Sequence, residues 1–541
     1  MMKKLPIGIQ SIREILEENQ AYVDKTGFAK ELIEKGKHYF MSRPRRFGKS
    51  LFLNTLEEIL KGNKKLFKEC QIYNSDYDWQ EYPVLYFDFA KLPNKTTEEF
   101  KTGLEEALED AAKLYGMSIS GSSCQSKLSR LTTELAQNNR VVVLVDEYDS
   151  PIINNLKNLE VAEQNRDFMK DFFGTLKSLD KYLKFTFVTG VSKFSQVSLF
   201  SGPNNLTDIT MDPRYATMMG YTEIELRQCF AEHVQSIIIK RSEDGEKVTK
   251  DQIFEEVREW YNGYRFSDKI ASVYNPYSTL RFLSAGKPES YWYSTGTPSF
   301  LIDLVKKYPQ SVIPLKGTAA LKSTLSDISK LDRINLPALM FQTGYLTIKD
   351  YNPNEDSYSL DFPNREVKEA FFNSLLQEFT EVDPLEVNRA AEEVRKDLEN
   401  FDVESFVNKM NIHFAKMAYQ LFSKANEGFY QAVFFTFLEK SGITTIAEMA
   451  TNIGRIDLIC EMPKATCIFE LKLDKTAGIA FDQAKFKKYR ERYTHNGKDI
   501  LVMGINFSSK TRNIGTWKGV VFSSSLQSTQ EIVPTKENHN L

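Results

Sequence analysis

The sequence predicts an α/β multidomain protein with a parallel-sheet domain, a helical or winged-helix-like middle domain and a smaller C-terminal α/β domain. Three observations support this fold class. Short apolar strands alternate with helical stretches up to about residue 218, which is typical of a parallel sheet. The apolar spacing then becomes mainly helical up to about residue 400. Strands and helices are mixed again beyond that point. We therefore expect domains at 1–218, 219–400 and 401–541.

Length and composition support several cores and a soluble chain. The 541 residues exceed the size of one ordinary domain, and 41% are hydrophobic and 26% charged. Apolar runs stay far below the roughly 18 to 20 residues of a membrane span, and the N-terminus lacks a secretory h-region. The five cysteines show no C-x-x-C spacing, which argues against a zinc site and a disulfide framework. We expect a cytoplasmic protein without a membrane partner.

The expected elements follow the chain in this order. The first domain contains four short strands, at 38–42, 83–89, 140–146 and 184–189. The middle domain is helical apart from a hairpin at 345–360, whose turn contains Asn352-Pro353-Asn354. The last domain begins with helical sequence at 406–440. A strand pair, a helix at 480–493 and a strand at 500–505 complete it.

A glycine-lysine-serine sequence follows the first strand and opens a helix, which is the context of a phosphate-binding loop. Backbone N–H groups at the helix start and the Lys49 ammonium would hold the β- and γ-phosphates of ATP, and the Ser50 hydroxyl would bind Mg²⁺. Arg43 replaces the usual first glycine. The residues expected to bind the nucleotide are Arg46, Phe47, Gly48, Lys49, Ser50 and Leu51.

A second acidic motif favours hydrolysis over passive binding. The apolar strand at 141–145 ends in Asp146 and Glu147. Asp146 would bind the nucleotide-associated Mg²⁺, and Glu147 would polarise the attacking water as a catalytic residue. Thr189 or Ser192, after the next strand, could sense the γ-phosphate, although a plain strand end is an equal alternative.

The sequence does not identify the group that neutralises the negative charge of the transition state. Arg45, Arg46, Lys193 and Arg214 are candidates, and surface or capping roles fit them equally well. An arginine could also come from another subunit, which would make the chain a homo-oligomer.

The C-terminal region contains a second candidate site on a hairpin. If the turn is centred between Pro463 and Lys464, antiparallel pairing sets Asp457 opposite Glu470. Period-2 alternation then places Arg455 and Lys472 on the same face. The opposite face is apolar and contains Ile456, Leu458, Cys460, Cys467, Phe469 and Leu471. One face should therefore be core and the other should gather charge.

Opposed carboxylates repel each other unless a cation lies between them, and their oxygens suit Mg²⁺ or Mn²⁺. Asp457 and Glu470 are therefore expected to be both metal ligands and catalytic residues. Lys472 would act as a catalytic residue that orients water and stabilises phosphorane-like charge. The competing interpretation is a surface hairpin with ordinary cross-strand charges.

The chain resembles AAA-ATPase-like proteins that carry a C-terminal PD-(D/E)XK nuclease-type domain. The resemblance rests on the motifs at 22–26, 43–51, 146–149, 189–192, 205–208, 220–223, 260–264 and 274–276, and on Asp457 with Glu470-x-Lys472. It implies that Arg43 belongs to the loop. It also implies that Glu427 could add a metal ligand and that Gln483 could border the active site. Ile456 departs from the proline in the superfamily's name, which leaves activity open.

These observations lead to two functional hypotheses. The first is an ATPase whose nucleotide state controls a metal-dependent nuclease-type domain acting on DNA or RNA. The second is an ATP-driven signalling or scaffold switch whose C-terminal domain binds nucleic acid without cleaving it. A P-loop kinase is disfavoured by the acidic pair after the apolar strand. Residues 464–518 contain 12 Lys/Arg and 5 Asp/Glu, which fits a polyanionic partner or a solvated face. The basic side chains on the expected helix are Lys485, Lys487, Lys488, Arg490 and Arg492.

Overall fold

The computed structural model divides the chain into two compact units. The first comprises residues 1–296 and 318–367, and the second comprises residues 297–317 and 368–541. The structure describes residues 2–194, 206–269, 271–293, 301, 318–326, 328, 334–380, 384–417, 421–422, 425–451, 454–486, 493, 497–524 and 529–533. Within these residues, no helix combines the length and apolar character needed to cross a membrane.

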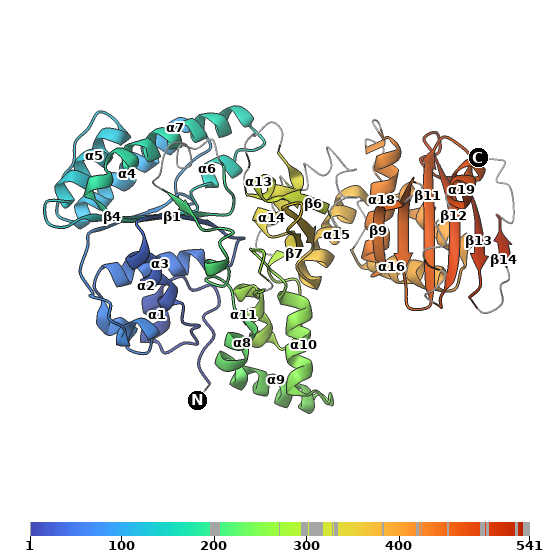
Figure 1. Cartoon of the computed structure of the whole chain (residues 1–541), viewed down its shortest axis with the longest axis horizontal. Coiled ribbons are helices and arrows are strands. Elements are labelled where there is room, and N and C mark those ends of the chain that lie inside the picture. The colour runs from blue at the N-terminus through green and yellow to red at the C-terminus, as the bar shows by residue number, and fades with distance from the viewer. Residues whose placement is uncertain are drawn as a thin grey trace. The chain divides into compact units, whose positions relative to one another are not determined.

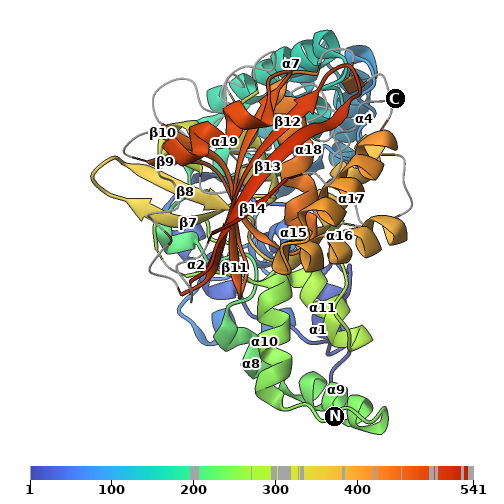
Figure 2. The same ribbon diagram turned by 90° about the vertical axis from the view of Figure 1, so that its right-hand side faces the viewer.

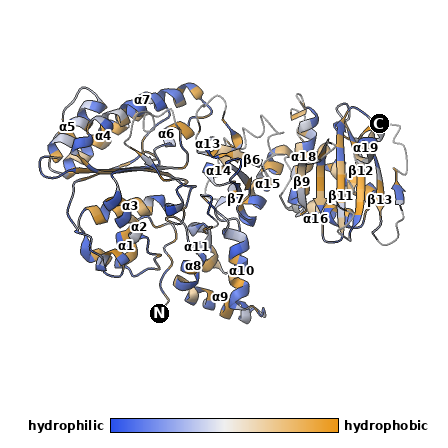
Figure 3. Ribbon diagram, in the orientation of Figure 1, coloured by the Kyte–Doolittle hydropathy of each residue, from blue (hydrophilic) through white to orange (hydrophobic). Residues whose placement is uncertain are grey.

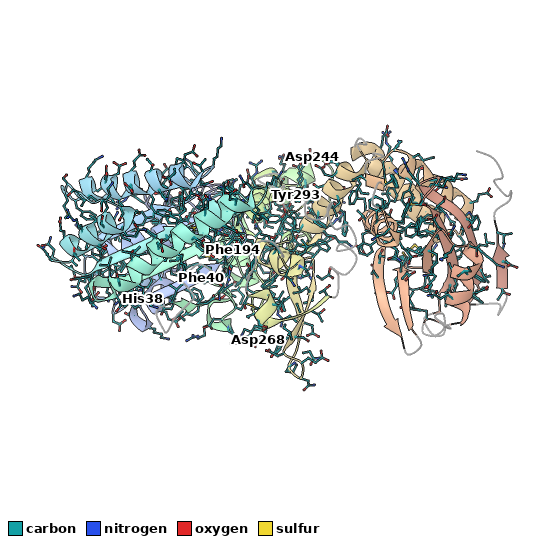
Figure 4. The ribbon with its side chains drawn as sticks, turned by 90° about the horizontal axis from the view of Figure 1, so that it is seen from above. His38, Phe40, Phe194, Asp244, Asp268 and Tyr293 are labelled. Atoms are coloured by element: carbon teal, nitrogen blue, oxygen red, sulfur yellow. The ribbon has the colours of Figure 1, made fainter. Side chains whose placement is uncertain are left out.

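A parallel five-stranded sheet forms the centre of the first unit (Figure 1). Its strands are β1 (His38–Ser42), β2 (Val84–Asp88), β3 (Val141–Asp146), β4 (Leu183–Gly190) and β5 (Thr207–Asp208), in the order β2-β3-β4-β1-β5. The four strands expected from the sequence are confirmed to within two residues. Figure 4 labels His38 and Phe40 on β1 and Phe194 just beyond β4. Because β4 lies between β1 and β3, the loops after β1 and β3 leave the same sheet edge with one strand between them.

Helices cover both faces of this sheet because each has one apolar side. On one face lie α1 (Ile12–Glu17), α2 (Thr26–Lys35) and α3 (Lys49–Leu60); on the other lie α4 (Thr97–Leu114), α5 (Cys124–Leu135) and α7 (Leu159–Ser178), with the short α6 (Ser150–Ile153) before it (Figure 1). In α3 the buried residues include Phe52, Leu56 and Ile59, which recur at helical spacing. α4 starts with a capping box between Thr96 and Glu99.

The rest of the first unit is mainly helical. It contains α8 (Glu223–Cys229), α9 (Ala231–Glu243), α10 (Lys250–Tyr261), α11 (Pro276–Ala285), α13 (Lys322–Leu325) and α14 (Leu336–Thr343). A three-stranded sheet is formed by β6 (Thr318–Leu321), β7 (Thr347–Asn352) and β8 (Ser357–Asp361). Antiparallel pairing of β7 with β8 confirms the expected hairpin. Short 3₁₀ helices lie at Lys64–Phe67, Gln71–Asn74, Asp180–Tyr182 and Pro213–Tyr215.

The compact units do not follow the expected boundaries at 218 and 400. Ala21 and Val23 share one buried core with apolar residues of α8 to α11, so burial joins the N-terminal segment to residues 219–296. α15 (Arg365–Thr380) instead contributes Phe372, whose ring lies 6.0 Å from that of Phe435 in the second unit. The expected middle segment is therefore shared between the two units because its apolar faces pack on different cores.

The second unit is built on a six-stranded sheet (Figure 2). Its strands are β9 (Thr444–Thr451), β10 (Gly454–Glu461), β11 (Ala465–Leu473), β12 (Asp499–Ser508), β13 (Asn513–Phe522) and β14 (Thr529–Ile532). Neighbouring strands are antiparallel except β11 and β12, which are parallel and joined through α19 (Ala477–Phe486). The other helices are α16 (Pro384–Glu399), α17 (Val403–Ala415) and α18 (Glu427–Lys440).

The hairpin formed by β10 and β11 is covered on both faces, and β11 is coloured largely hydrophobic in Figure 3. Ile459 and Ile468 lie in one buried cluster with residues of α19. On the opposite face the Phe469 ring lies 5.4 Å from Phe434 of α18. The expectation that a whole face gathers charge is therefore wrong, because α19 buries most of that face and leaves the charged side chains at one end.

Gly504 on β12 lets α19 approach the sheet closely. It is the register partner of Glu470 on β11. A Cβ at this position would lie 2.3 Å from the backbone nitrogen of Phe481 and 2.6 Å from the carbonyl oxygen of Ala477. Since both atoms belong to the α19 backbone, a side chain here would push the helix off the sheet beside Glu470.

We predict that Gly504→Ala destabilises the second unit by about 1–3 kcal/mol, the usual cost of overpacking a well-packed core. The matched control is Gly478→Ala in α19, whose Cβ would meet only the Thr476 hydroxyl oxygen, at 3.7 Å. The control should be neutral or stabilising, because alanine favours a helix over glycine. Denaturant unfolding of both variants tests this. Equal stability of the two would contradict the close approach of α19.

Candidate functional site

The loop between β1 and α3 has the geometry of a phosphate-binding turn. Gly48 precedes the first residue of α3 and has a φ of +88°, a backbone conformation that favours glycine. No side chain caps the start of this helix, so its first N–H groups are not occupied by a capping side chain. Lys49 is 3% exposed and is the first residue of α3. A buried cation at a helix start creates a positive site for an anion.

Lys49 lies directly against the acidic pair that follows β3. Its Nζ is 3.1 Å from Glu147 Oε1 and 3.3 Å from the Pro44 carbonyl oxygen. Glu147 adopts a positive φ of 46°, which is uncommon for a residue with a side chain. The structure therefore brings the expected loop lysine and the expected acidic pair together across the intervening strand.

Asp146 is buried beside the helix start. It accepts a hydrogen bond from the Ser50 hydroxyl and one of 3.3 Å from the Tyr86 hydroxyl. Burial, together with the neighbouring Glu147, raises the pKa of the Asp146 carboxyl to about 6. A buried carboxylate and a hydroxyl in contact are suitable oxygen ligands for Mg²⁺.

These groups line one cavity of about 430 Å³, large enough for a small-molecule ligand. It is lined by the expected residues Arg46, Gly48, Lys49, Ser50, Leu51, Asp146 and Glu147, and by Pro6, Gly8, Ile9, Gln10, Arg45, Asp88, Ala90, Ser150, Asn154, Tyr221, Pro276, Tyr277 and Leu280. Phe47 differs from the other expected loop residues. Its side chain is buried and packs against Tyr264 at 4.7 Å, so only its backbone can serve a ligand.

Two of the four candidate charge-neutralising residues reach the cavity. Arg45 and Arg46 line it. Lys193 instead lies 2.7 Å from Asp208. Arg214 lies 2.6 Å from Asp212, the residue that caps the short 3₁₀ helix at Pro213–Tyr215. The structure thus favours the loop arginines over the other two.

For Thr189 and Ser192, the structure favours the alternative of a plain strand end over a γ-phosphate sensor. The Thr189 hydroxyl donates to the Met41 carbonyl oxygen at 2.8 Å, and the Ser192 hydroxyl donates to Asp149 Oδ2 at 2.6 Å. Both residues are fully buried, and neither lines the cavity. Their hydroxyl groups instead hold neighbouring strands and loops together.

Arg43 explains how the loop keeps its shape without a first glycine. The side chain is fully buried and donates to the carbonyl oxygens of Thr210 at 2.7 Å and Tyr215 at 3.3 Å. Its guanidinium lies 4.1 Å from the centre of the Phe266 ring. Burial lowers the pKa of Arg43 to about 9. Arg43 is therefore a structural cation that supports the loop from behind.

Asp88 is a candidate that the sequence analysis missed. It ends β2, pairs in register with Asp146 on β3 and lines the same cavity. Its Oδ1 accepts from the Ala90 backbone, and its Oδ2 lies 3.1 Å from the exposed Lys91. The available signal was an aspartate at the end of a buried strand, because carboxyl ends of parallel strands share one edge.

The second site gathers three carboxylates around one lysine. Lys472 Nζ lies 3.3 Å from Glu470 Oε1, 3.7 Å from Asp457 Oδ2 and 3.9 Å from Glu427 Oε1. The pairing of Leu458 with Phe469 confirms the expected register, which sets Asp457 opposite Glu470. All three expected carboxylates and the expected lysine therefore meet at one point.

Backbone hydrogen bonds hold two of these carboxylates in place. Asp457 Oδ2 accepts from the Leu471 N–H at 2.8 Å, and Glu427 Oε2 accepts from the Leu473 N–H at 3.1 Å. Glu427 is the first residue of α18, so the helix start brings it to the end of β11. Burial acts to lower the pKa of Lys472, but the three carboxylates outweigh it and raise that pKa.

The chemistry of this donor set fits a hard divalent cation, because three carboxylates converge on a positive centre. Within the part of the chain that is described, however, no group of three His, Cys, Asp or Glu side chains is already arranged to hold a metal ion. The ammonium group of Lys472 draws the carboxylates toward itself. A metal would therefore need the carboxylates to turn away from Lys472.

Some expected neighbours are only partly described. Gln483 lies half-buried on α19. Lys485 belongs to the same helix, but its side chain lies outside the described residues, as does that of Arg455. The expected helix at 480–493 is described only to Phe486. Lys487, Lys488, Arg490 and Arg492 all lie outside the described residues, so the expected basic run stays a prediction.

Comparisons with known proteins match both regions. Residues 6–200 match the family model described as a predicted AAA-ATPase, and residues 425–517 match the PD-(D/E)XK nuclease superfamily. The chain is 36% identical over 524 residues to an "Uncharacterized protein in vnfD 5'region" of Azotobacter chroococcum mcd 1. That match covers 95% of this chain and 98% of the relative. The first matched range includes Lys49 and Asp146, and the second includes Asp457 and Lys472.

We predict that Arg43→Met destabilises the first unit by about 1–3 kcal/mol, because the buried carbonyl oxygens of Thr210 and Tyr215 lose their donor. Arg214→Met is the control, because the Arg214 side chain is itself exposed and ion pairs at the surface contribute at most about 1 kcal/mol. Denaturant midpoints of the two variants give the comparison. A larger loss for Arg214→Met would contradict the structural role of Arg43.

Proposed function

This chain belongs to a family of predicted AAA-ATPases with a C-terminal PD-(D/E)XK nuclease superfamily domain, and we propose that it hydrolyses ATP at Lys49 and cleaves nucleic acid at Asp457. The observation that carries the proposal is the contact between Lys49 and Glu147 inside a cavity that Asp146 also lines. The loop can bind the phosphates, the acidic pair can serve the metal ion and the attacking water, and the cavity can hold the nucleotide, as phosphoryl transfer to water requires.

In the proposed ATPase site, Lys49 and the first N–H groups of α3 hold the β- and γ-phosphates. Ser50 and Asp146 hold Mg²⁺, which when bound neutralises charge that develops on the phosphates. Arg45 and Arg46 are the cavity-lining cations available to add to this effect. An arginine from a second copy of the chain remains the alternative source, in which case the active form is a homo-oligomer.

The pairing of Lys49 with Glu147 suggests how binding prepares hydrolysis. In the structure, Lys49 neutralises Glu147 at 3.1 Å. A triphosphate carries more negative charge and competes for the same ammonium. Glu147 is then released to accept a hydrogen bond from the attacking water, which is the role of a general base. Asp88, at the neighbouring strand end, adds a further carboxylate to this edge.

In the proposed nuclease site, Asp457, Glu470 and Glu427 hold Mg²⁺ or Mn²⁺, which when bound activates water and stabilises charge on the scissile phosphate. Lys472 orients the water and stabilises negative charge in the transition state. The substrate class is DNA or RNA, since the phosphodiester is the group that such a site recognises. We further propose that the nucleotide state of the first site controls this activity.

One observation favours the second candidate function, an ATP-driven switch that binds nucleic acid without cleaving it. The described part of the second unit contains no preformed group of three metal-ligating side chains. If the carboxylates stay bound to Lys472, the site holds no divalent ion and cannot activate water. Cleavage and binding assays therefore decide between the two candidates.

We predict that Lys49→Ala abolishes Mg²⁺-dependent ATP hydrolysis and that Glu147→Gln slows turnover by about 10²–10⁴-fold, the usual contribution of a general base. Glu147→Gln should still bind ATP, because Lys49 remains. The control is Lys101→Ala, which removes an exposed ion pair with Glu98 on α4 and a 5.9 Å contact with the Phe168 ring, both outside the cavity. Phosphate release and ATP affinity are measured for each variant. Wild-type turnover in both site variants would refute the assignment.

We predict that Asp457→Ala and Lys472→Ala each lower divalent-dependent cleavage of nucleic acid by at least about 100-fold. Asp482→Ala is the control, because it removes an exposed carboxylate on nearby α19. Single- and double-stranded DNA and RNA are incubated with Mg²⁺ or Mn²⁺, with and without ATP. Cleavage by both site variants would place the activity elsewhere. Binding by the wild type without any cleavage would establish the switch instead.

A further inference from the structure

The phosphate-binding loop is packed from behind by residues of the helical part of the first unit. Arg43 lies 4.1 Å from the ring centre of Phe266. The Phe47 ring contacts the rings of Tyr264 at 4.7 Å and Phe266 at 5.6 Å. These aromatic contacts come from residues more than 200 positions further along the chain. The non-glycine residues of the loop therefore fix it to that part of the unit.

Two further contacts involve the arginines that line the cavity. The Trp292 indole N–H donates to the Arg45 carbonyl oxygen at 3.0 Å. The Arg46 guanidinium lies 4.9 Å from the ring centre of Tyr277. Tyr277 also lines the cavity, on the side formed by α11. The loop and α11 thus both line the cavity, and Trp292 is hydrogen-bonded to the loop.

A single buried carboxylate joins these two parts of the lining. Glu366, in the first turn of α15, accepts the Trp292 backbone N–H at 2.6 Å and the Ser278 hydroxyl at 3.0 Å, both through Oε1. Glu366 is fully buried, and its Oε2 has no hydrogen-bond partner among the described residues. Ser278 belongs to α11, one residue after Tyr277. Glu366 therefore connects α11, which contains Tyr277, to Trp292, which is hydrogen-bonded to the Arg45 carbonyl oxygen.

We propose that Glu366 is a positioning residue of the nucleotide cavity, which sets nucleotide affinity by holding α11 and the phosphate-binding loop in register through Ser278 and Trp292. The inference rests on the proposed ATP-binding function and adds a residue that touches neither phosphate nor metal. Its effect passes through the hydrogen bonds from Ser278 and Trp292, and the Tyr291 backbone N–H is a further donor to the same carboxyl. Any change that weakens these bonds lets α11 and the loop separate and lowers affinity.

The surroundings of Glu366 make this junction sensitive to pH. The titratable groups that interact with its carboxyl are the hydroxyls of Tyr261 on α10, Tyr264 and Tyr291. Burial raises the pKa of Glu366 to about 8. The group is therefore neutral at pH 7 and charged at pH 9, where a negative charge is buried among tyrosine rings. Its contribution to stability is complete below its unfolded pKa of about 4.3 and is lost as the pH rises through about 8.

Calorimetric titration of the full chain with Mg-ADP at pH 7 and pH 9 tests the inference. The wild-type Kd should rise about tenfold between the two pH values, because opening of the junction hydrates the ionised carboxyl, and this gain outweighs the stronger hydrogen bonds that a carboxylate accepts. Glu366→Gln keeps the neutral acceptor and should lose this rise while binding at pH 7 like the wild type. The control, Glu259→Gln, removes a nearby exposed carboxylate paired with Arg365 and should keep the wild-type rise.

A second variant keeps the test valid if Glu366→Gln does not fold. Trp292→Phe retains a ring and the backbone N–H bonded to Glu366, but removes the indole donor to Arg45, so it should weaken binding at both pH values and keep the pH-dependent rise. Wild-type affinity and pH dependence in both Glu366→Gln and Trp292→Phe would overturn the positioning role. Absence of binding in every folded variant, including the wild type, is a different result, which would overturn the ATP proposal together with this inference.

Discussion

The ion pair between Lys49 and Glu147 is the interaction on which the first unit depends. It forms because the sheet places β4 between β1 and β3, so that the loop after β1 meets the acidic pair after β3 at one edge. A buried lysine is costly unless an anion balances it. Glu147 supplies that anion in the structure, and the phosphates of ATP would compete for the same ammonium.

The second unit also pairs a lysine with carboxylates, but there one lysine faces three of them. One lysine, Lys472, neutralises three carboxylates at the end of a hairpin whose remaining face is closed by α19. A divalent cation that enters must replace the ammonium as the centre of the cluster. In the first unit the phosphates of ATP would replace Glu147 as the partner of Lys49, whereas in the second unit a divalent cation would replace Lys472 as the partner of the carboxylates. Both proposed activities would begin with the displacement of such a pair.

Much of this arrangement could be predicted from local sequence, because it depends on strand ends and period-2 pairing. The four strands of the first sheet, the loop at Lys49 and the register of Asp457 with Glu470 all follow from such patterns. Local sequence patterns could not predict which side chains the tertiary structure buries. Nothing local shows that Ser192 bonds to Asp149, that Arg43 is buried, or that α15 divides its contacts between two cores. Glu366 was missed for the same reason, since only the fold brings it to Ser278 and Trp292. Asp88 differs, because its position at the end of a buried strand was a local signal.

The most direct test of the central claim is a crystal structure of the chain with Mg²⁺ and a non-hydrolysable ATP analogue. The account predicts that the triphosphate occupies the cavity beside Gly48, with Lys49 Nζ bonded to a phosphate oxygen and separated from Glu147. A nucleotide bound elsewhere, or Lys49 still paired with Glu147 beside bound phosphates, would contradict it.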